Sequence, residues 1–459
     1  MKIHFIGIGG AGMSALATIC LASGNEVSGS DISENEAIRR LRSWGAKIYT
    51  QHSPDNVHDA ELVVYSSAIA PENAELVEAR KRGIPTIKRG ELLAQLMRDK
   101  KGIVIAGTHG KTTTSSLVSL MLERNGLDPT IIIGGEVHDI GGNAKLGRSD
   151  FFVAEADESD GSFLFLTPWI AVITNIDSDH LDYYGSMEEL VSAFSKFSYQ
   201  VKEDGYIVAC YDDPYIKGLK FPRPTIYYGL SPEAHLWADE IKVSENGTSC
   251  RVNKGEQEIL QLNLQLLGRQ NVYNALAATS VGLILGIDLD DIKSSLESLR
   301  GVHRRLERIG SYDDILVYDD YAHHPTEISA TLRTLKEAFP QRRIVCAFQP
   351  HRYTRTHLLH KELASALCEA DVLILTSIYP AGEEPIENVS SHLILSSLES
   401  LGKNALYLEN LNDIPDCLFK LSAPGDIILT LGAGNIDRCA YQLLEKARDE
   451  KVKTNRKKR

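Results

Sequence analysis

The stretch GIVIAGTHGKTTTSSLVSLML, residues 102–122, contains the residue types that bind phosphate. Glycines let successive backbone N–H groups point at an anion, Lys111 supplies a positive charge, and the Thr112 hydroxyl is a ligand that Mg²⁺ accepts. A capped helix start would explain the threonines but not the lysine and its glycines. The loop is shorter than a full P-loop, because Ile105 stands where the first glycine would be. The pattern predicts a nucleoside triphosphate site formed by Gly107, Thr108, His109, Gly110, Lys111, Thr112 and Thr113.

A second glycine-rich turn opens the chain. The segment IHFIGIGGAGMSALA, residues 3–17, matches G-x-G-x-x-G between a predicted strand and a predicted helix, and Asp31 ends the next strand. Such a turn brings the backbone close to a diphosphate, whose charge the helix N-terminus favours. The motif leaves open whether the ligand is NAD or another diphosphate compound, and a tight strand–helix turn without a ligand has the same pattern.

Acidic side chains follow two later predicted strands. The ends of parallel strands are where open α/β sheets place their ligands, and carboxylates bind Mg²⁺. Each cluster alone is equally well explained by helix caps. Because both follow the phosphate loop on consecutive strands, we expect a two-cation site. The two clusters are Glu155, Asp157, Glu158 and Asp160, and then Asn175, Asp177, Asp179, His180 and Asp182.

The elements that position these residues alternate between short apolar strands and helical segments along the whole chain. This alternation predicts an α/β fold of three consecutive parts: a Rossmann-like domain (1–98), a central P-loop ATPase-like domain (99–302) and a Rossmann-like C-terminal domain (303–459). Near the end of the central part, EIKVSENGTSCRV alternates around Asn246-Gly247. That pattern predicts a small antiparallel excursion with a type I′ turn.

Composition narrows the class of protein. The 459 residues carry a formal net charge of −13, which argues against a nucleic-acid partner. The seven cysteines are scattered, and the chain has no run of 18 apolar residues and no signal-peptide pattern. We therefore expect a cytoplasmic protein with no membrane span, either a monomer or a homodimer. The terminal run KVKTNRKKR is expected to be a mobile, solvated tail.

Several motifs together resemble the Mur ligase family, the cytoplasmic ATP-dependent amide-forming enzymes of peptidoglycan synthesis. GTHGKTT, EADESD, TNIDSDHLD, GRQNVYNALAA, HRRLE and DDYAHHPTE occur in the family's order and span nearly the whole chain. The opening GIGGAGMSALA, with VYSSAI and FQPHRYTRT, resembles the branch that adds the first amino acid. The resemblance implies UDP-N-acetylmuramate, L-alanine and ATP as substrates, together with two Mg²⁺ ions.

The resemblance also assigns roles to residues. The UDP-sugar diphosphate would bind the first turn, with Gly9, Gly10, Ala11, Gly12, Asp31, Ser66 and Ser67 as substrate-binding residues. ATP would contact the second turn together with Asn271, Asn274, Arg305 and Asp320, and Arg305 is favoured over Arg304 as the γ-phosphate arginine. The metal ligands would be Thr112, Glu155 and His180. The muramoyl carboxylate and alanine would meet Tyr321, His323, His351, Arg352 and Arg355, and the implied catalytic residues are Lys111, Arg305, His323 and His351.

Some alternatives stay open at this stage. His323 and His351 are equal candidates for the base that deprotonates alanine, and a purely structural role for both histidines is equally open. Arg352 and Arg355, three residues apart, would share one helix face suited to a carboxylate. A ligase that attaches a whole tripeptide to the same UDP-sugar shares most motifs, and an NAD-dependent dehydrogenase or NAD-binding regulator would leave the second turn unexplained. Later-acting family members have a carbamylated lysine near position 194, where this chain has Phe194, with Lys196 predicted to point elsewhere.

Overall fold

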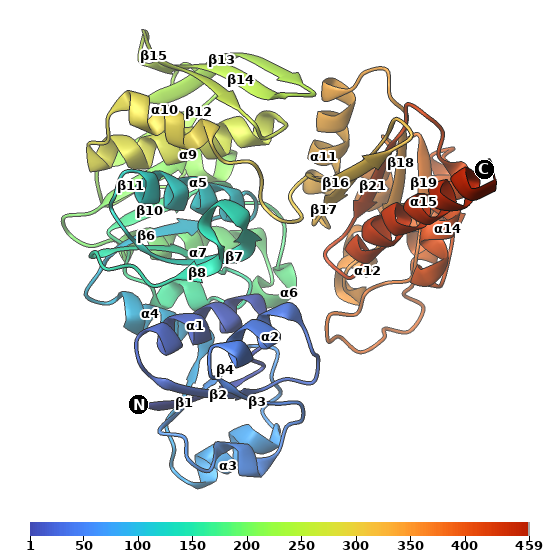
Figure 1. The fold of residues 1–459 in the computed structure, drawn as a ribbon. Helices are drawn as coiled ribbons and strands as arrows, with labels where there is room; N and C mark the ends of the chain where they lie inside the picture. The colour runs from blue at the N-terminus through green and yellow to red at the C-terminus, as the bar shows by residue number, and fades with distance from the viewer. Residues whose placement is uncertain (458–459) are drawn as a thin grey trace. The chain divides into compact units, whose positions relative to one another are not determined.

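The computed structural model describes residues 1–457, which form two compact units. The N-terminal unit comprises residues 1–240, 250–263 and 271–300, and the C-terminal unit comprises 241–249, 264–270 and the residues from 301 onward. Three sheets with flanking helices run along the chain, which confirms the predicted succession of three α/β parts (Figure 1). The first two sheets lie in the same unit, so the boundary placed between residues 98 and 99 stays a prediction.

The first sheet is parallel with the strand order β3-β2-β1-β4-β5. Figure 1 shows α1 and α2 on one face of this sheet and α3 on the other. Both faces are therefore covered, which explains why four of the five β1 residues are buried. The elements are β1 (Lys2–Ile6), α1 (Ala11–Ala22), β2 (Glu26–Ser30), α2 (Glu36–Ser43), β3 (Lys47–Tyr49), β4 (Leu62–Tyr65), α3 (Ala74–Lys81), β5 (Thr86–Lys88) and α4 (Arg89–Met97).

The second sheet has the order β15-β14-β13-β12-β11-β10-β6-β9-β7-β8, in which β10, β6 and β9 are parallel neighbours. The sequence pattern did not indicate the antiparallel pair of β7 and β8. The strands are β6 (Lys101–Ala106), β7 (Thr130–Val137), β8 (Gly142–Lys145), β9 (Phe151–Glu155), β10 (Ile170–Ile173), β11 (Tyr206–Cys210), β12 (Thr225–Gly229), β13 (Leu236–Ser244), β14 (Gly247–Lys254) and β15 (Gln257–Leu264). The helices are α5 (Lys111–Arg124), α6 (Leu181–Tyr184), α7 (Met187–Tyr199), α8 (Pro214–Lys217), α9 (Arg269–Leu285) and α10 (Leu289–Glu297).

The predicted antiparallel excursion is confirmed, because β13 and β14 are neighbours joined by a two-residue connection. The prediction of a type I′ turn is wrong. A type I′ turn needs positive φ at both central residues, and Asn246 does not adopt it, whereas Gly247 does, at +131°. A Cβ on Gly247 would lie 2.0 Å from the carbonyl oxygen of Leu264, so the glycine is needed for close packing rather than for that turn type.

The third sheet, in the C-terminal unit, has the order β16-β17-β21-β18-β19-β20 and is parallel except for β16. Leu332 of α11 and Leu363 of α12 belong to the apolar core on one face, and Leu443 of α15 belongs to a second core. The elements are β16 (Glu307–Tyr312), β17 (Ile315–Asp320), α11 (Pro325–Ala338), β18 (Ile344–Phe348), α12 (Tyr353–Leu367), β19 (Val372–Leu375), α13 (His392–Ser400), β20 (Leu406–Tyr407), α14 (Ile414–Leu421), β21 (Ile427–Leu431) and α15 (Asp437–Lys457).

Helix α15 continues to Lys457, so residues 451–457 of the terminal basic run are helical, and residues 458–459 lie outside the described part. The mobility expected for this run stays a prediction. Among the described residues, no helix combines the length and apolarity that a membrane crossing requires.

Candidate active site

The predicted triphosphate loop connects β6 to α5, and its two glycines hold backbone conformations that other residues avoid. Gly107 has a φ of +132° and Gly110, the N-cap of α5, has a φ of +81°. A Cβ on Gly107 would lie 2.0 Å from Oγ1 of Thr174, and one on Gly110 would lie 2.6 Å from Oδ1 of Asn274. The loop therefore requires glycine at both positions, and it leads into the N-terminus of α5, a helix end of the kind that favours anions.

The segment after β10 holds this loop in place. Asn175 accepts a hydrogen bond from the His109 backbone N–H (2.8 Å) and donates one to the His109 carbonyl (3.0 Å), to which Thr174 also donates (2.7 Å). The Asp177 backbone N–H donates to Oγ1 of Thr108 (2.9 Å). These contacts give Asn175 and Asp177 a loop-bracing role that the sequence did not indicate, and their place in a cation site stays a prediction.

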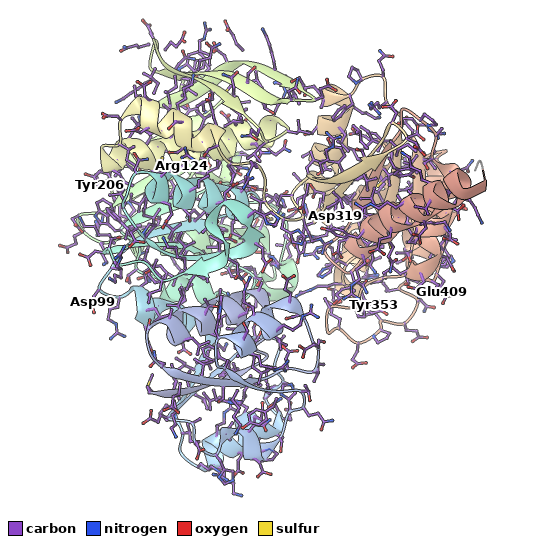
Figure 2. The ribbon with its side chains drawn as sticks, in the orientation of Figure 1. Asp99, Arg124, Tyr206, Asp319, Tyr353 and Glu409 are labelled. Atoms are coloured by element: carbon purple, nitrogen blue, oxygen red, sulfur yellow. The ribbon has the colours of Figure 1, made fainter. Side chains whose placement is uncertain are left out.

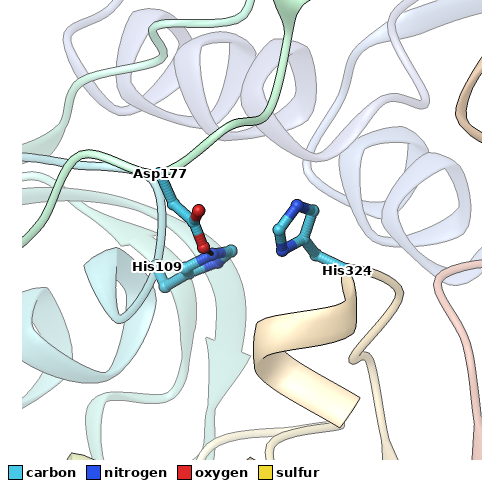
Figure 3. A group of neighbouring side chains, drawn as sticks. All are labelled: His109, Asp177 and His324. Carbon is cyan, nitrogen blue, oxygen red and sulfur yellow. Dashed lines mark hydrogen bonds and ion pairs between the residues drawn. The ribbon is translucent and has the colours of Figure 1, made fainter. Parts of the chain in front are cut away.

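The His109 ring has a specific partner. Figure 3 shows the His109 ring and the Asp177 carboxylate directed at each other, and Nε2 lies 3.0 Å from Oδ2. The figure also draws His324, which belongs to the C-terminal unit and caps α11. Oδ2 of Asp177, a member of the second acidic cluster, therefore contacts the His109 ring. The side chain of Asp182, in the same cluster, lies outside the described part.

Lys111 lies in a strongly acidic environment. Its ammonium group contacts both carboxylate oxygens of Glu158, at 2.8 and 2.9 Å, and donates to the Gly107 carbonyl. Burial alone would lower the pKa of Lys111, but the Glu158 carboxylate outweighs it and the pKa is raised. Burial also raises the pKa of Glu158 to about 7, against the opposing effect of Lys111. The lysine therefore stays positively charged within the loop.

Glu155, predicted as a metal ligand, lies next to Thr112, as that prediction requires. Thr112 Oγ1 donates to Glu155 Oε2 (3.2 Å), and Ser115 and the Gly134 backbone donate to Oε1 (2.9 and 2.8 Å). The site is thus lined by oxygen atoms at the start of α5. His180, which has a positive φ of 59°, lies farther along, with Nε2 3.8 Å from Glu158 Oε1.

The two asparagines predicted to meet adenine lie behind the loop. Asn274, only 6% exposed, accepts a hydrogen bond from Thr114 (3.1 Å) and donates to Asn271 (2.9 Å). The same side chain faces Gly110. Asn274 therefore braces the start of α5, which the sequence alone did not indicate, and contact with adenine stays a prediction.

The first glycine turn connects β1 to α1 with Gly7 at a φ of +80°. Asp31 accepts from the Gly9 backbone N–H (2.9 Å), and Asn35 donates to the Gly9 carbonyl (3.0 Å). A Cβ on Gly9 would come within 2.9 Å of the Asp31 carboxylate. Asp31 thus holds the turn itself. Ser66, at the end of β4, lies beside Gly7, while the neighbouring Ser67 is exposed.

The buried carboxylate of Glu75 contacts Ser30, the residue that binds the backbone of the first turn. The Ser30 carbonyl accepts from the Gly7 and Ile8 backbones, and the Ser30 hydroxyl donates to Glu75, which is fully buried. Burial favours the neutral acid, but contacts with His4, Ser30 and Asn56 outweigh it and lower the pKa of Glu75 to about 2. Glu75 is therefore ionised wherever the protein is used near neutral pH.

Arg89 is a residue that sequence reasoning missed. It begins α4, and its guanidinium would lie 2.9 Å from a Cβ placed on Gly12 of the first turn. The same guanidinium contacts Asp157 Oδ2 at 2.7 Å. Burial favours the neutral acid, but Arg89, the hydrogen bonds from Ser159 and the charge of Lys111 together outweigh it and lower the pKa of Asp157 to about 2. One ion pair thus connects the first glycine turn with the acidic cluster that holds Lys111.

In the C-terminal unit, the two arginines of HRRLE have different surroundings. Arg304 donates to Asp319 (2.9 Å) and to the carbonyls of Gly432 and Gly434, so its three nitrogens bind the protein itself. Arg305 is about one-third exposed and approaches Glu327 at 4.0 Å. Both guanidinium carbons lie 5.1 Å from the centre of the Tyr321 ring. This difference favours Arg305, as predicted, for contact with a substrate.

Asp320, predicted to bind ribose, accepts backbone hydrogen bonds with both oxygens. Leu306 donates to Oδ2 and Ala322 to Oδ1, each at 2.7 Å. Burial raises the pKa of Asp320 to about 7, against the effect of Arg305. The carboxyl group thus holds the HRRLE loop on β17, and a ribose contact would use its remaining lone pairs.

The residues predicted to bind the carboxylate and alanine lie together at the carboxyl ends of β17 and β18. The rings of Tyr321 and His323 are 5.5 Å apart, as are those of His323 and His351. His351 stacks on Tyr379 with an angle of 11° between the rings. Tyr379 is a member of this cluster that the sequence did not indicate, because it follows a different strand.

The prediction that Arg352 and Arg355 share a helix face is wrong. Helix α12 begins at Tyr353, labelled in Figure 2 together with Asp319 of β17, and Arg352 is its N-cap with a φ of +71°. Arg355 lies within the first turn and is 8% exposed, and its Nη1 is 3.2 Å from Nδ1 of His351. Arg355 is therefore a buried partner of His351 rather than a surface arginine. Phe194 is buried and Lys196 is exposed, which agrees with the prediction that the two side chains point in different directions.

Comparisons with known proteins agree on one family over nearly the whole chain. Three family models match in succession: the Mur ligase family catalytic domain (residues 2–101), the Mur ligase middle domain (residues 105–282) and the Mur ligase glutamate ligase domain (residues 304–434). Together they cover both glycine turns and the cluster around His323.

Among curated proteins, the UDP-N-acetylmuramate--L-alanine ligase of Pelotomaculum thermopropionicum is 48% identical, covering 97% of this chain and 98% of its own length. That of Dictyoglomus turgidum is also 48% identical, with 98% and 97% covered. The crystal structure of the UDP-N-acetylmuramate-alanine ligase from Thermotoga maritima matches with a TM-score of 0.85 at 34% identity, covering 98% of this chain and all of that one. A murein peptide ligase from Psychrobacter arcticus shares the fold, with a TM-score of 0.74 at 24% identity over 97% of this chain and 98% of its own.

Proposed function

This chain belongs to the Mur ligase family, and we propose that it uses ATP to join L-alanine to the muramoyl carboxylate of UDP-N-acetylmuramate. The observation that carries the proposal is the presence of two separate phosphate turns in one compact unit, Gly7–Gly12 and Gly107–Lys111. A dehydrogenase would use the first turn and leave Lys111 without a task, whereas a ligase acting on a UDP-sugar needs both.

ATP binds the second turn. The backbone of Gly107, Thr108, His109, Gly110, Thr112 and Thr113 surrounds the phosphates, and Lys111 contributes its charge. A phosphate competes with Glu158 for the lysine ammonium, and the raised pKa of Glu158 makes its release less costly. We assign adenine contacts to Asn271 and Asn274, the ribose to Asp320, and the γ-phosphate to Arg305.

The residues at the start of α5 fit Mg²⁺, which prefers oxygen ligands. Thr112 and Glu155 present a hydroxyl and a carboxylate 3.2 Å apart, and we assign them to one ion and His180 to a second. When bound, Mg²⁺ would neutralise charge on the transferring phosphoryl group. Replacing His180 with alanine should raise the Mg²⁺ concentration needed for half-maximal activity, and an unchanged titration would return His180 to a structural role.

The UDP-sugar binds the first turn through Gly9, Gly10, Ala11 and Gly12 at the N-terminus of α1. Asp31 holds the turn, Ser66 and Ser67 extend the site from β4, and Arg89 adds a positive charge beside Gly12. The Arg89–Asp157 pair places this charge next to the acidic cluster of the ATP site. The muramoyl carboxylate and alanine are assigned to Tyr321, His323, His351, Arg352 and Arg355.

The reaction proceeds in two steps. The muramoyl carboxylate attacks the γ-phosphorus of ATP, giving an acyl phosphate and ADP. The neutral alanine amine then attacks the acyl carbon, so that a C–N bond forms and phosphate leaves. The first step brings two anions together, so Lys111 and Arg305 act mainly by electrostatic stabilisation. Family members work in the cytoplasm, where both nucleotides are supplied, and we propose the same place of action here.

The test is a panel of amino acids. The protein is incubated with ATP, Mg²⁺, UDP-N-acetylmuramate and each amino acid in turn, and phosphate release is measured. L-alanine should support release, and omission of the UDP-sugar should abolish it. Absence of alanine-dependent release would reject the proposal. Preference for the tripeptide over free alanine would favour the recycling ligase, which shares the fold but only 24% of its residues with this chain in the Psychrobacter structure.

A further inference from the structure

His323 and His351, in the C-terminal unit, have hydrogen-bond partners of opposite kinds. These partners determine which ring nitrogen of each histidine carries the hydrogen. An imidazole nitrogen that faces an acceptor carries a hydrogen, and one that faces a donor carries a lone pair. Which nitrogen is protonated can therefore be assigned from the neighbours, as is usual for histidine.

His323 faces acceptors through Nδ1. This nitrogen lies 3.1 Å from the carbonyl oxygen of Tyr321 and 3.5 Å from Oε2 of Glu327. A carbonyl oxygen has no hydrogen to donate, so Nδ1 carries the hydrogen and Nε2 is the basic nitrogen. Glu327 is itself held by the backbone N–H groups of His323 and His324, at 3.1 and 3.3 Å. Its position behind the ring is therefore fixed.

His351 faces a donor through Nδ1. Nη1 of Arg355 lies 3.2 Å from this nitrogen and 3.4 Å from the His351 carbonyl oxygen. A guanidinium group has only hydrogens to offer, so Nδ1 of His351 is the acceptor and Nε2 carries the hydrogen. Stacking on Tyr379 holds the ring in this orientation.

The charged neighbours reinforce the difference. A proton gained by His323 places a positive charge beside the Glu327 carboxylate, with Arg305 4.0 Å from the other oxygen of Glu327. A proton gained by His351 would place a second positive charge beside the buried Arg355 and would break their hydrogen bond. The Tyr321 and Tyr379 rings pack against His323 and His351 respectively.

We infer that His323 is the general base that deprotonates the alanine ammonium, whereas His351 is a hydrogen-bond donor to a substrate oxygen; this inference rests on the proposed function. Nε2 of His323 takes one proton from the alanine –NH₃⁺ group, and the neutral amine attacks the acyl phosphate. The C–N bond forms, the C–O bond to phosphate breaks, and the departing phosphate takes the second proton from nitrogen. Glu327 is a positioning residue that stabilises the imidazolium.

The experiment compares two nucleophiles. Alanine is an ammonium ion at neutral pH and needs a base, whereas hydroxylamine is already neutral and intercepts the same acyl phosphate without one. Phosphate release is measured with ATP, UDP-N-acetylmuramate and either nucleophile for wild type, His323→Gln, Glu327→Gln and His351→Gln. His360→Gln is the control, because His360 lies on α12 and its ring contacts only the hydroxyl of Ser397 among the described hydrogen bonds (2.8 Å).

We expect His323→Gln to lower the alanine-dependent rate about 100-fold or more, in the range of general-base effects, and to change the hydroxylamine-dependent rate only a few-fold. Glu327→Gln should lower the ratio of the alanine-dependent rate to the hydroxylamine-dependent rate, but by a smaller factor than His323→Gln does. His351→Gln should leave this ratio at the wild-type value. Equal loss with both nucleophiles in His323→Gln, or a ratio that falls only in His351→Gln, would overturn the assignment. If wild type released phosphate with hydroxylamine but not with alanine, the proposed function would fail instead.

Discussion

Replacing Gly107 with alanine tests whether the second turn is a rigid phosphate site. Its φ of +132° lies in a region that only glycine adopts readily, and such strain costs about 1–3 kcal/mol. The new Cβ would also lie 2.0 Å from Oγ1 of Thr174, whose hydrogen bond to His109, worth about 1 kcal/mol, would be lost. The two effects add to about 2–4 kcal/mol and act on the residues that surround the phosphates.

Calorimetric titration with a non-hydrolysable ATP analogue measures this effect. A cost of about 2 kcal/mol corresponds to about 30-fold weaker binding, which is the smallest change we expect. UDP-N-acetylmuramate binding should be unchanged, because the first turn lies on another sheet. The matched control is Gly126→Ala at the other end of α5, where φ is also positive, at +70°, but nothing lies within 4 Å of the new Cβ.

The control should lower the melting temperature slightly, since an alanine in this conformation costs about 1–2 kcal/mol, and should leave ATP binding unchanged. Adding Thr174→Ala to Gly107→Ala removes the clashing oxygen, so the double variant should lose less affinity than the sum of the two single variants. ATP-analogue binding within threefold of wild type in Gly107→Ala would refute the rigid-loop argument.

Three further predictions concern charged groups. Lys111→Met should abolish turnover and lower the melting temperature, because Glu158 is left buried without its partner. Adding Glu158→Gln should restore the melting temperature but not turnover. Restored turnover in this double variant would contradict a catalytic role for Lys111. Arg304→Lys should lower the melting temperature of the C-terminal unit, because Arg304 binds Asp319, whereas Arg305→Lys should reduce turnover and leave the melting temperature unchanged. Reduced turnover in Arg304→Lys together with a lowered melting temperature in Arg305→Lys would exchange the two roles. The pKa of Glu75 is lowered to about 2 in the folded protein, so ionised Glu75 stabilises the fold by about 3 kcal/mol. This stabilisation is complete above the unfolded pKa of about 4.5 and is lost as the pH falls towards 2. The stability of Glu75→Gln should therefore not show this loss between pH 4.5 and 2, and an acid denaturation profile identical to that of wild type would argue against the role of Glu75.

The sequence predicted the parts of the site that depend on local backbone conformation. Gly107 and Gly110 could be recognised because a phosphate turn requires residues that adopt positive φ and leave room for an anion. The same holds for the first turn and for the alternation of strands and helices. The preference for Arg305 over Arg304 came from the motif, and the structure supplies the physical reason, since Arg304 is held by Asp319.

Contacts that depend on the order of strands in a sheet could not be predicted in this way. Asn175 braces the phosphate loop because β10 lies beside β6, and Arg89 meets Asp157 although 68 residues separate them. The contacts of the two acidic clusters with Arg89, Lys111 and His109 could not be predicted either, because these partners are distant in the sequence. Arg352 was misplaced because spacing alone does not show where a helix begins.

The claim that ATP activates the muramoyl carboxylate can be tested by one isotope measurement. UDP-N-acetylmuramate labelled with ¹⁸O in both oxygens of its carboxylate is incubated with ATP, Mg²⁺ and L-alanine, and the products are analysed by mass spectrometry. An acyl phosphate requires one labelled oxygen to leave with phosphate and the other to remain in the new amide. We expect inorganic phosphate with one ¹⁸O and an alanyl product that retains one. Unlabelled phosphate formed together with the amide product would contradict the account.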